Sequence, residues 1–176
     1  FNTGVEITYK PTNYLFVTLN PGFNKSFSEL QYVRRLTYSG SDRYVFASID
    51  RMTISTSFRL NFNLSPDLTL QYWGQPFVAT GHYYDHKYIN DPMADRYEDR
   101  FHLYTPDQKT YDTDHYNIDE DLDGNTDYTF GNNNFNVQEF LSNLVIRWEY
   151  NPGSTVYLVW SQTRSYSNST GQMDFL

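Results

Sequence analysis

The densest group of carboxylates in this chain lies at residues 119–127, where the sequence reads DEDLDGNTD. Its aspartates and glycine match the first, third, fifth, sixth and ninth positions of an EF-hand-type calcium loop. Carboxylates at alternate positions of a tightly turning loop converge on a hard cation, and the glycine permits the turn. The sequence therefore predicts a calcium site whose ligands are Asp119, Asp121, Asp123, Asn125 through its backbone oxygen, and Asp127.

This loop departs from an EF-hand in two respects. Phe130 occupies the twelfth position, where a bidentate glutamate is usual, and no helical pattern flanks the loop. Asp112 or Asp114, the nearest carboxylates in sequence, is predicted to replace that glutamate. The alternative interpretation is a hydrated acidic tip. Residues 105–127 hold eight acidic residues and one lysine, so without a cation their repulsion favours disorder.

Two other groups of residues carry types that could do chemistry. His82 and His86 lie ~13 Å apart if they share a strand, which is too far for one metal ion. Glu98 and Asp99 stand between two arginines, where charge balance is a commoner role than glycosidic catalysis. No nucleophile elbow, phosphate loop or catalytic triad pattern appears. We therefore predict no catalytic residue, and the sequence favours a role other than an enzyme's.

Aromatic residues are abundant, with 17 Tyr and 13 Phe among 176 residues. Trp73, Trp148 and Trp160 have two interpretations: girdle aromatics at a membrane interface, or platforms that stack on sugars. The first is the simpler one. A net charge of −8 argues against a nucleic-acid partner, and the absence of cysteine excludes disulfides and thiolate metal sites.

The elements that position these residues are strands. Residues 52–64 alternate for thirteen positions: even positions carry Ile54, Phe58, Leu60 and Phe62, and odd positions are polar. Only a strand has this period of two, and this run is far longer than an ordinary globular strand. A transmembrane strand of ~9–11 residues explains the length. The even residues are then predicted to face lipid, and Arg59 faces the barrel interior.

Six strands are predicted, at residues 1–10, 14–37, 43–65, 67–84, 136–151 and 154–166. Tight turns at Pro11, Pro66 and Pro152 alternate with longer connections, the longest being an acidic loop at about 85–135. Short turns at one end and long loops at the other are typical of outer-membrane barrels. Six strands are fewer than the eight of the smallest such barrels, so the chain is expected to leave its first and last strands unclosed.

Two blocks carry a resemblance to a known family. The first is RYVFASIDRMTISTSFRLNFNLSPDLTLQYWGQPFVATGHY followed by DRFHLY, and the second is FLSNLVIRWEYNPGSTVYLVWSQTR. Together with the acidic Asp/Gly loop before the second block, they resemble the C-terminal barrel of Bacteroidota outer-membrane proteins of unknown function. Those proteins carry an N-terminal domain similar to family 9 carbohydrate-binding modules. The resemblance spans about residues 30–165, and this chain departs from the family at both ends.

The resemblance implies an outer-membrane barrel of unassigned activity, and the label of membrane-associated hydrolase brings no catalytic residues with it. We therefore expect an all-β fold: an antiparallel up-and-down transmembrane β-barrel, of which residues 1–176 form part of one domain. A structural role, a transport role or a place in a surface complex, with a link to carbohydrate handling, is expected in the bacterial outer membrane. The expected partners are lipid, the rest of the barrel, other outer-membrane proteins and a glycan. The alternative is a soluble, calcium-dependent β-sandwich that binds carbohydrate.

Overall fold

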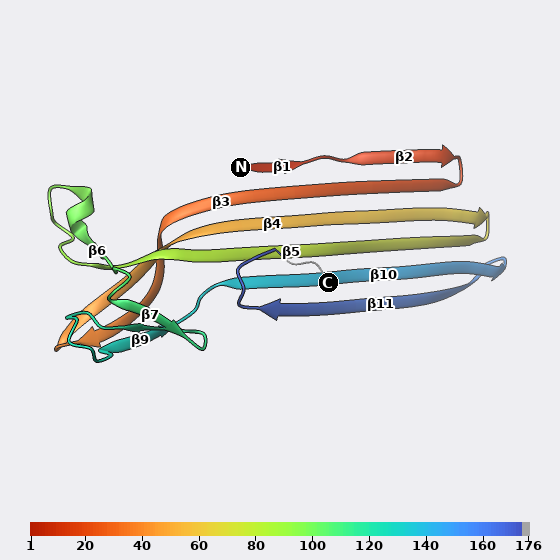
Figure 1. Ribbon diagram of the computed structural model, residues 1–176. Helices are drawn as coiled ribbons and strands as arrows, with labels where there is room; N and C mark the ends of the chain where they lie inside the picture. The colour runs from red at the N-terminus through yellow and green to blue at the C-terminus, as the bar shows by residue number, and fades with distance from the viewer. Residues whose placement is uncertain (174–176) are drawn as a thin grey trace.

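The alternating segments form one long antiparallel sheet in the computed structural model, which describes residues 1–173 (Figure 1). The end of the predicted domain, residues 174–176, lies outside the described residues. The long strands pair in the order in which they follow one another in the chain. They are β3 (Leu15–Tyr38), β4 (Ser41–Ser65), β5 (Leu68–Ile89), β10 (Phe135–Asn151) and β11 (Ser154–Asn168). The predicted all-β, antiparallel fold is confirmed.

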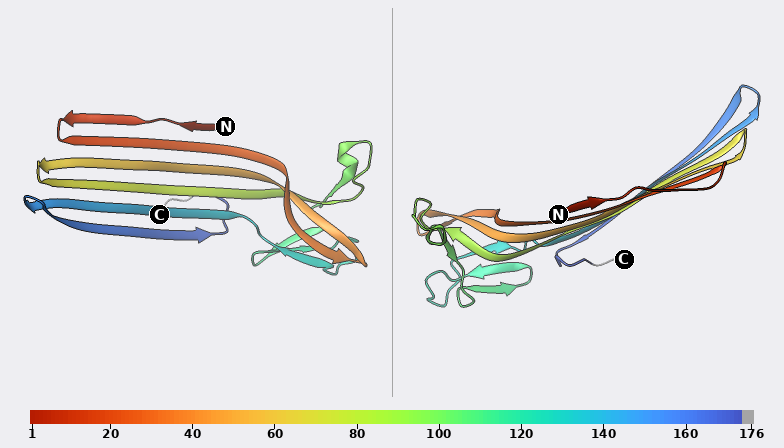
Figure 2. Two further views of the ribbon diagram at one scale, coloured as in Figure 1. Left: turned by 180° about the vertical axis from the view of Figure 1, so that it is seen from behind. Right: turned by 90° about the horizontal axis from the view of Figure 1, so that it is seen from above.

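The first predicted strand is two short ones. β1 (Asn2–Gly4) and β2 (Ile7–Thr12) both pair with β3, on the side away from β4. Within residues 1–173 neither of them pairs with β11, so the sheet stays open at both edges (Figure 2). In the same residues, no helix is long and apolar enough to cross a membrane.

The two faces of the long sheet differ in chemistry. Residues directly opposite on paired strands share a face, so the register aligns Leu19 with Phe58, and Leu60 with Tyr72 and then Leu144. We call this the apolar face. On the opposite, polar face, Arg59 aligns with Trp73 and then with Asn143. The alternation read from residues 52–64 therefore continues across four neighbouring strands.

The tight turns lie together at one end of the sheet (Figure 1). They are Pro66–Asp67, Pro152–Gly153 and Asn13–Tyr14. The prediction for the first turn was wrong in detail. Pro11 lies inside β2, where an edge strand tolerates its missing N–H. Asp121 lies at the other end of the sheet, as the alternation of short and long connections predicts.

The connection at 85–135 was predicted to be a long acidic loop. It instead contains short strands of its own. β5 continues to Ile89, and a short 3₁₀ turn, η1 (Tyr97–Arg100), leads into β6 (Phe101–Leu103), which pairs back onto β5. A separate three-stranded sheet follows, made of β7 (Lys109–Asp112), β8 (His115–Ile118) and β9 (Tyr128–Gly131). We call residues 104–131 the head.

The buried core lies between the head and the far end of β4, away from the tight turns. Its members are Val45, Tyr104, Ile118, Tyr128 and Phe130. Between Val45 and Asn63, the β-bulges lie on the neighbouring strands and not on β4, so side chains alternate regularly along β4. Val45, Ala47 and Ile49 therefore lie on the same face as Arg59. These three side chains are 0% exposed. On β4, the apolar side chains thus lie on one face before about residue 50 and on the opposite face after it. The reason is that the head covers only the segment before residue 50.

The turn end of the sheet has no such layer. A β-sandwich needs a second sheet packed ~10 Å over the first. Within residues 1–173, the only second sheet is that of the head, and it packs at the far end of the strands. Large apolar side chains on β11 remain exposed, including Leu158 at 60% and Trp160 at 57%. The apolar face near the turns therefore lacks a protein partner in the described part of the chain.

Candidate metal centre and its anchor

The acidic loop joins β8 to β9 at the side of the head that faces the β3–β4 hairpin. A strand pair, not a pair of helices, closes it: Ile118 lies opposite Tyr128, and the Asp127 N–H donates to the Ile118 carbonyl at 2.8 Å. A hairpin base of this kind fixes both ends of the loop. The absence of flanking helices from the sequence pattern is thereby explained.

Side-chain carboxylates organise the backbone of the loop. Asp119 accepts hydrogen bonds from the N–H groups of Asp123 at 3.1 Å and Gly124 at 2.9 Å. Asp121 also accepts from the Asp123 N–H at 3.2 Å, and Asp123 accepts from Asn125 at 2.8 Å. Gly124 has a φ of 88°, a conformation that favours glycine. The loop therefore turns tightly and directs its first carboxylates inward.

Three of the five predicted ligands come together. Asp119, Asp121 and Asp127 each offer an oxygen atom, and these atoms all lie within 4.8 Å of one another. Asp123 is not part of this group of side chains, and the predicted contribution of the Asn125 backbone oxygen stays a prediction. Three carboxylates this close repel one another in the absence of a cation, and hard cations such as calcium and magnesium take oxygen ligands. The residues present fit such an ion with three carboxylates.

The prediction that Asp112 or Asp114 completes the site is wrong. In the antiparallel pairing of β7 with β8, Asp112 lies opposite His115, while Lys109 lies opposite Ile118. Asp112 and Asp114 therefore sit at the hairpin tip, and the acidic loop begins at the other end of β8. Nearness in sequence misleads here because the hairpin reverses the chain.

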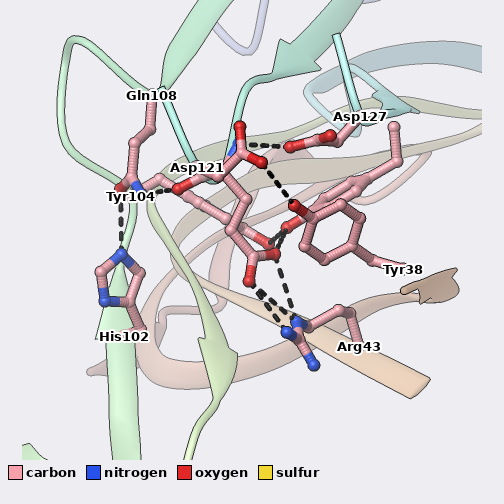
Figure 3. A network of polar contacts seen from close by, with 9 residues as sticks. Tyr38, Arg43, His102, Tyr104, Gln108, Asp121 and Asp127 are labelled. Atoms are coloured by element: carbon pink, nitrogen blue, oxygen red, sulfur yellow. Dashed lines mark hydrogen bonds and ion pairs between the residues drawn. The ribbon is translucent and has the colours of Figure 1, made fainter. Parts of the chain in front are cut away.

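Glu120, the second residue of the acidic loop, anchors it to the long sheet through Arg43, which is labelled in Figure 3. The Arg43 guanidinium on β4 donates from Nε and Nη2 to this carboxylate at 2.9–3.2 Å. Tyr128 donates its hydroxyl to the other side of Glu120, and the Gln108 amide donates to its backbone carbonyl at 2.8 Å. Tyr38 on β3 adds a hydrogen bond to Asp121 at 3.3 Å. The loop is thus tied to both strands of the β3–β4 hairpin.

The electrostatics of this anchor favour an ionised Glu120. Burial alone would raise the pKa of the Glu120 carboxyl, but hydrogen bonds from Arg43 and Tyr128 outweigh it, and the pKa is lowered. Burial, followed by the bond to Glu120, raises the pKa of the Tyr128 hydroxyl. Burial and the nearby Asp121 raise the pKa of Tyr38 to about 12. At neutral pH the tyrosines are therefore donors and Glu120 an acceptor.

The sequence offered no signal for this anchor. Arg43 and Glu120 are 77 residues apart; Arg43 belongs to no motif, and Glu120 occupies a position of the calcium-loop pattern that supplies no ligand. Glu120 looked like one more acid in an acidic run. The two carboxylates considered for glycosidic catalysis, Glu98 and Asp99, instead form ion pairs with Arg96 at the exposed surface.

His86 is a further buried polar group at the head end of the sheet. It follows Asp85, whose φ of 50° marks an irregularity where β5 carries an extra residue opposite β4. The imidazole is 1% exposed and packs against the rings of Tyr116 at 4.6 Å and Phe130 at 5.3 Å. Neither of its nitrogens has a hydrogen-bond partner among the described residues. His86 therefore contributes to head packing as a neutral ring.

We predict that acidification loosens the head through His86. Burial, followed by the charges of Lys109 and His82, lowers the pKa of His86 to about 4, against ~6.5 in an unfolded chain. Because the folded pKa is lower, the stabilisation is complete above pH ~6.5 and declines as the pH falls toward 4. Linkage gives a loss of about 2 kcal/mol between pH 7 and pH 5.

Amide hydrogen exchange of β8 and β9 at the two pH values measures this loss. The matched control is His86→Phe, which keeps the ring and removes the titration, so its protection should not change between pH 7 and pH 5. An equal loss of protection in both proteins would assign the effect to other groups.

Comparisons with known proteins do not place the chain in a family. No family model, no curated protein and no solved structure matches it. The resemblance to the Bacteroidota outer-membrane proteins therefore stays a prediction, and the function is argued from the geometry alone.

Proposed function

We propose that this chain forms part of the wall of a β-barrel in a bacterial outer membrane, with the head at the outer surface. The observation that carries the proposal is the apolar face, which spans the long strands near the tight turns and which no other described residues cover. In water such a continuous apolar surface is costly, whereas in a bilayer it is solvated by lipid. The opposite, polar face then lines the barrel interior.

The dimensions support this assignment. On β4, the apolar alternation from Ile54 to Phe62 covers nine residues, or ~30 Å of strand. A tilted strand of this length crosses an apolar band of ~25 Å. Trp148 and Tyr150 lie beside the turn at Pro152, where a girdle of aromatic residues is expected.

The open edges and the connections support a role as one part of a larger barrel. An unpaired strand edge inside lipid leaves backbone groups unsatisfied, at a cost of several kcal/mol each. β11 and the β1–β2 edge therefore need strands beyond those described to pair with. The short turns are assigned to the periplasmic side and the head to the outer side, as in known barrels.

Cysteine accessibility tests the proposal. Phe58→Cys and Arg59→Cys are introduced separately into the cysteine-free chain, which is then folded into phosphatidylcholine vesicles. A membrane-impermeant maleimide should leave the Phe58→Cys variant unlabelled, because lipid covers that position, whereas the Arg59→Cys variant should react when the reagent enters the polar interior. Vesicle flotation reports membrane association in parallel. A chain that stays monomeric and soluble without detergent, with both positions labelled equally, would contradict the proposal.

We extend the proposal to a cation at the three aspartates of the head, with calcium as the ion. Charge neutralisation would stabilise a loop whose carboxylates otherwise repel one another, and the Arg43–Glu120 contact would connect the ordered loop to β4. Three carboxylates without a bidentate glutamate predict weaker binding than that of a sensor EF-hand.

Calcium should slow proteolysis between residues 105 and 130. The double substitution Asp119→Asn and Asp121→Asn should abolish the protection. Asp112→Asn with Asp114→Asn, which removes the same charge at the hairpin tip, should leave it intact. Unchanged cleavage of the wild-type chain at millimolar calcium would leave only the hydrated loop.

A further inference from the structure

Trp73 differs from the other two tryptophans in the face that it occupies. Trp148 aligns with Leu68 and Val156, and Trp160 aligns with Leu144, so both stand on the apolar face. Trp73 stands on the polar face, between Arg59 on β4 and Asn143 on β10. Contact with lipid on the apolar face accounts for the first two but not for an indole on the polar side of the wall.

The surroundings of Trp73 form a shallow hollow of about 410 Å³. That volume falls within the usual range for small-molecule sites. Tyr72 and six further residues line it, and we call these six the Trp73 patch: Arg59, Asn61, Gln71, Trp73, Asn143 and Val145. Three neighbouring strands contribute to it, so the register of the sheet fixes the relative positions of its members.

The polar side chains of the Trp73 patch have unused hydrogen-bonding capacity. Within residues 1–173, Arg59, Asn61, Gln71 and Asn143 make no side-chain hydrogen bond or ion pair with the protein. Arg147, which lies on the same face two rows nearer the turns, is by contrast paired with Glu149 at 3.0 Å. Arg59 therefore presents an uncompensated guanidinium beside an indole.

We propose that the Trp73 patch binds a saccharide on the interior wall of the barrel. A pyranose ring has an apolar face of C–H groups, which suits the flat indole, and a rim of hydroxyls. Guanidinium and amide groups on both sides of the indole can bond that rim. Arg59 adds affinity for a sugar that carries a carboxylate. This assignment rests on the proposed function, because it takes the polar face to be the water-filled interior.

The test is calorimetric titration of the chain, folded in detergent micelles, with two probes. The probes are a glucose tetrasaccharide and a galacturonic acid tetrasaccharide, each up to about 10 mM, a concentration that detects weak binding. Both should bind, the acidic one more tightly. Trp73→Leu should weaken both at least about ten-fold, whereas Trp160→Leu on the apolar face should not. Arg59→Gln should remove only the preference for the acidic probe.

Asn143→Ala serves as a second variant in case Trp73→Leu does not fold, as judged by circular dichroism. Absence of binding of either probe to the folded chain would overturn the proposal, as would unchanged binding in both patch variants. Flotation separates this result from the proposed function. A chain that floats with vesicles but binds no sugar refutes the saccharide site alone, and a chain that binds sugar without floating refutes the membrane wall alone.

Discussion

In the proposed orientation, Phe58→Arg should lower the free energy of unfolding from a bilayer by about 2–4 kcal/mol. Phe58 lies on the apolar face midway between Ile54 and Phe62, level with Leu19 on β3 and Gly74 on β5. An arginine there places a guanidinium near the bilayer midplane, where lipid offers it no hydrogen-bond partners. Urea titration of the chain in vesicles, followed by tryptophan fluorescence, measures the difference.

The matched control for this substitution is Asn61→Arg. Asn61 is on the same strand but on the polar face, and its side chain is exposed. Its replacement adds the same charge and bulk, and it should change the free energy of unfolding by less than about 1 kcal/mol. Equal costs for the two substitutions would show that the faces do not differ in solvent, and the membrane assignment would fall.

Arg43→Met should destabilise the docking of the head by about 3 kcal/mol, the scale expected when a buried ion pair loses one partner. The side chains of Arg43 and Glu120 are 22% and 10% exposed, so the loss leaves a shielded carboxylate with the Tyr128 and Tyr88 hydroxyls as its remaining side-chain donors. The guanidinium also lies over the rings of Tyr38 and Tyr88, at 5.5 and 5.0 Å. Hydrogen exchange of β9 amides measures the effect.

Two further variants distinguish the contribution of the Arg43–Glu120 ion pair from the general effect of losing an arginine. Arg43→Met combined with Glu120→Gln should recover part of the stability, because no carboxylate is then left unpaired. Arg35→Met breaks the exposed pair with Asp42 on the same hairpin, where solvent screens the charges, and should cost clearly less than Arg43→Met. If Arg43→Met costs no more than Arg35→Met, the anchor does not hold the head.

The strands and their faces could be predicted because each depends on local chemistry. Alternation along residues 52–64 sets which side chains share a face, whatever the rest of the chain does. The turns at Pro66 and Pro152 follow from residues that favour tight reversal. Pro11 misled for the same local reason: an edge strand accepts a proline, so the residue type alone does not mark the turn.

The head could not be predicted because its order comes from contacts between distant segments. Residues 85–135 are polar and acidic, without a long alternating run, so they read as a loop. Their strands are four residues long at most, apart from the end of β5, and gain stability from packing Ile118 and Phe130 against Val45. Short strands of this kind need a tertiary partner to form.

By itself, the sequence determined an antiparallel all-β fold, the length of its main strands, the two faces of the sheet and the acidic loop at the end away from the tight turns. Period, turn residues and charge are local properties, so they can be read along the chain. Only the tertiary structure decided that Asp119, Asp121 and Asp127 converge while Asp123 does not, and that Arg43 holds Glu120. It also decided that Trp73 faces Arg59 and Asn143. Each of these pairings joins residues from different strands or loop ends, and the register that brings them together is set by cross-strand hydrogen bonds and packing.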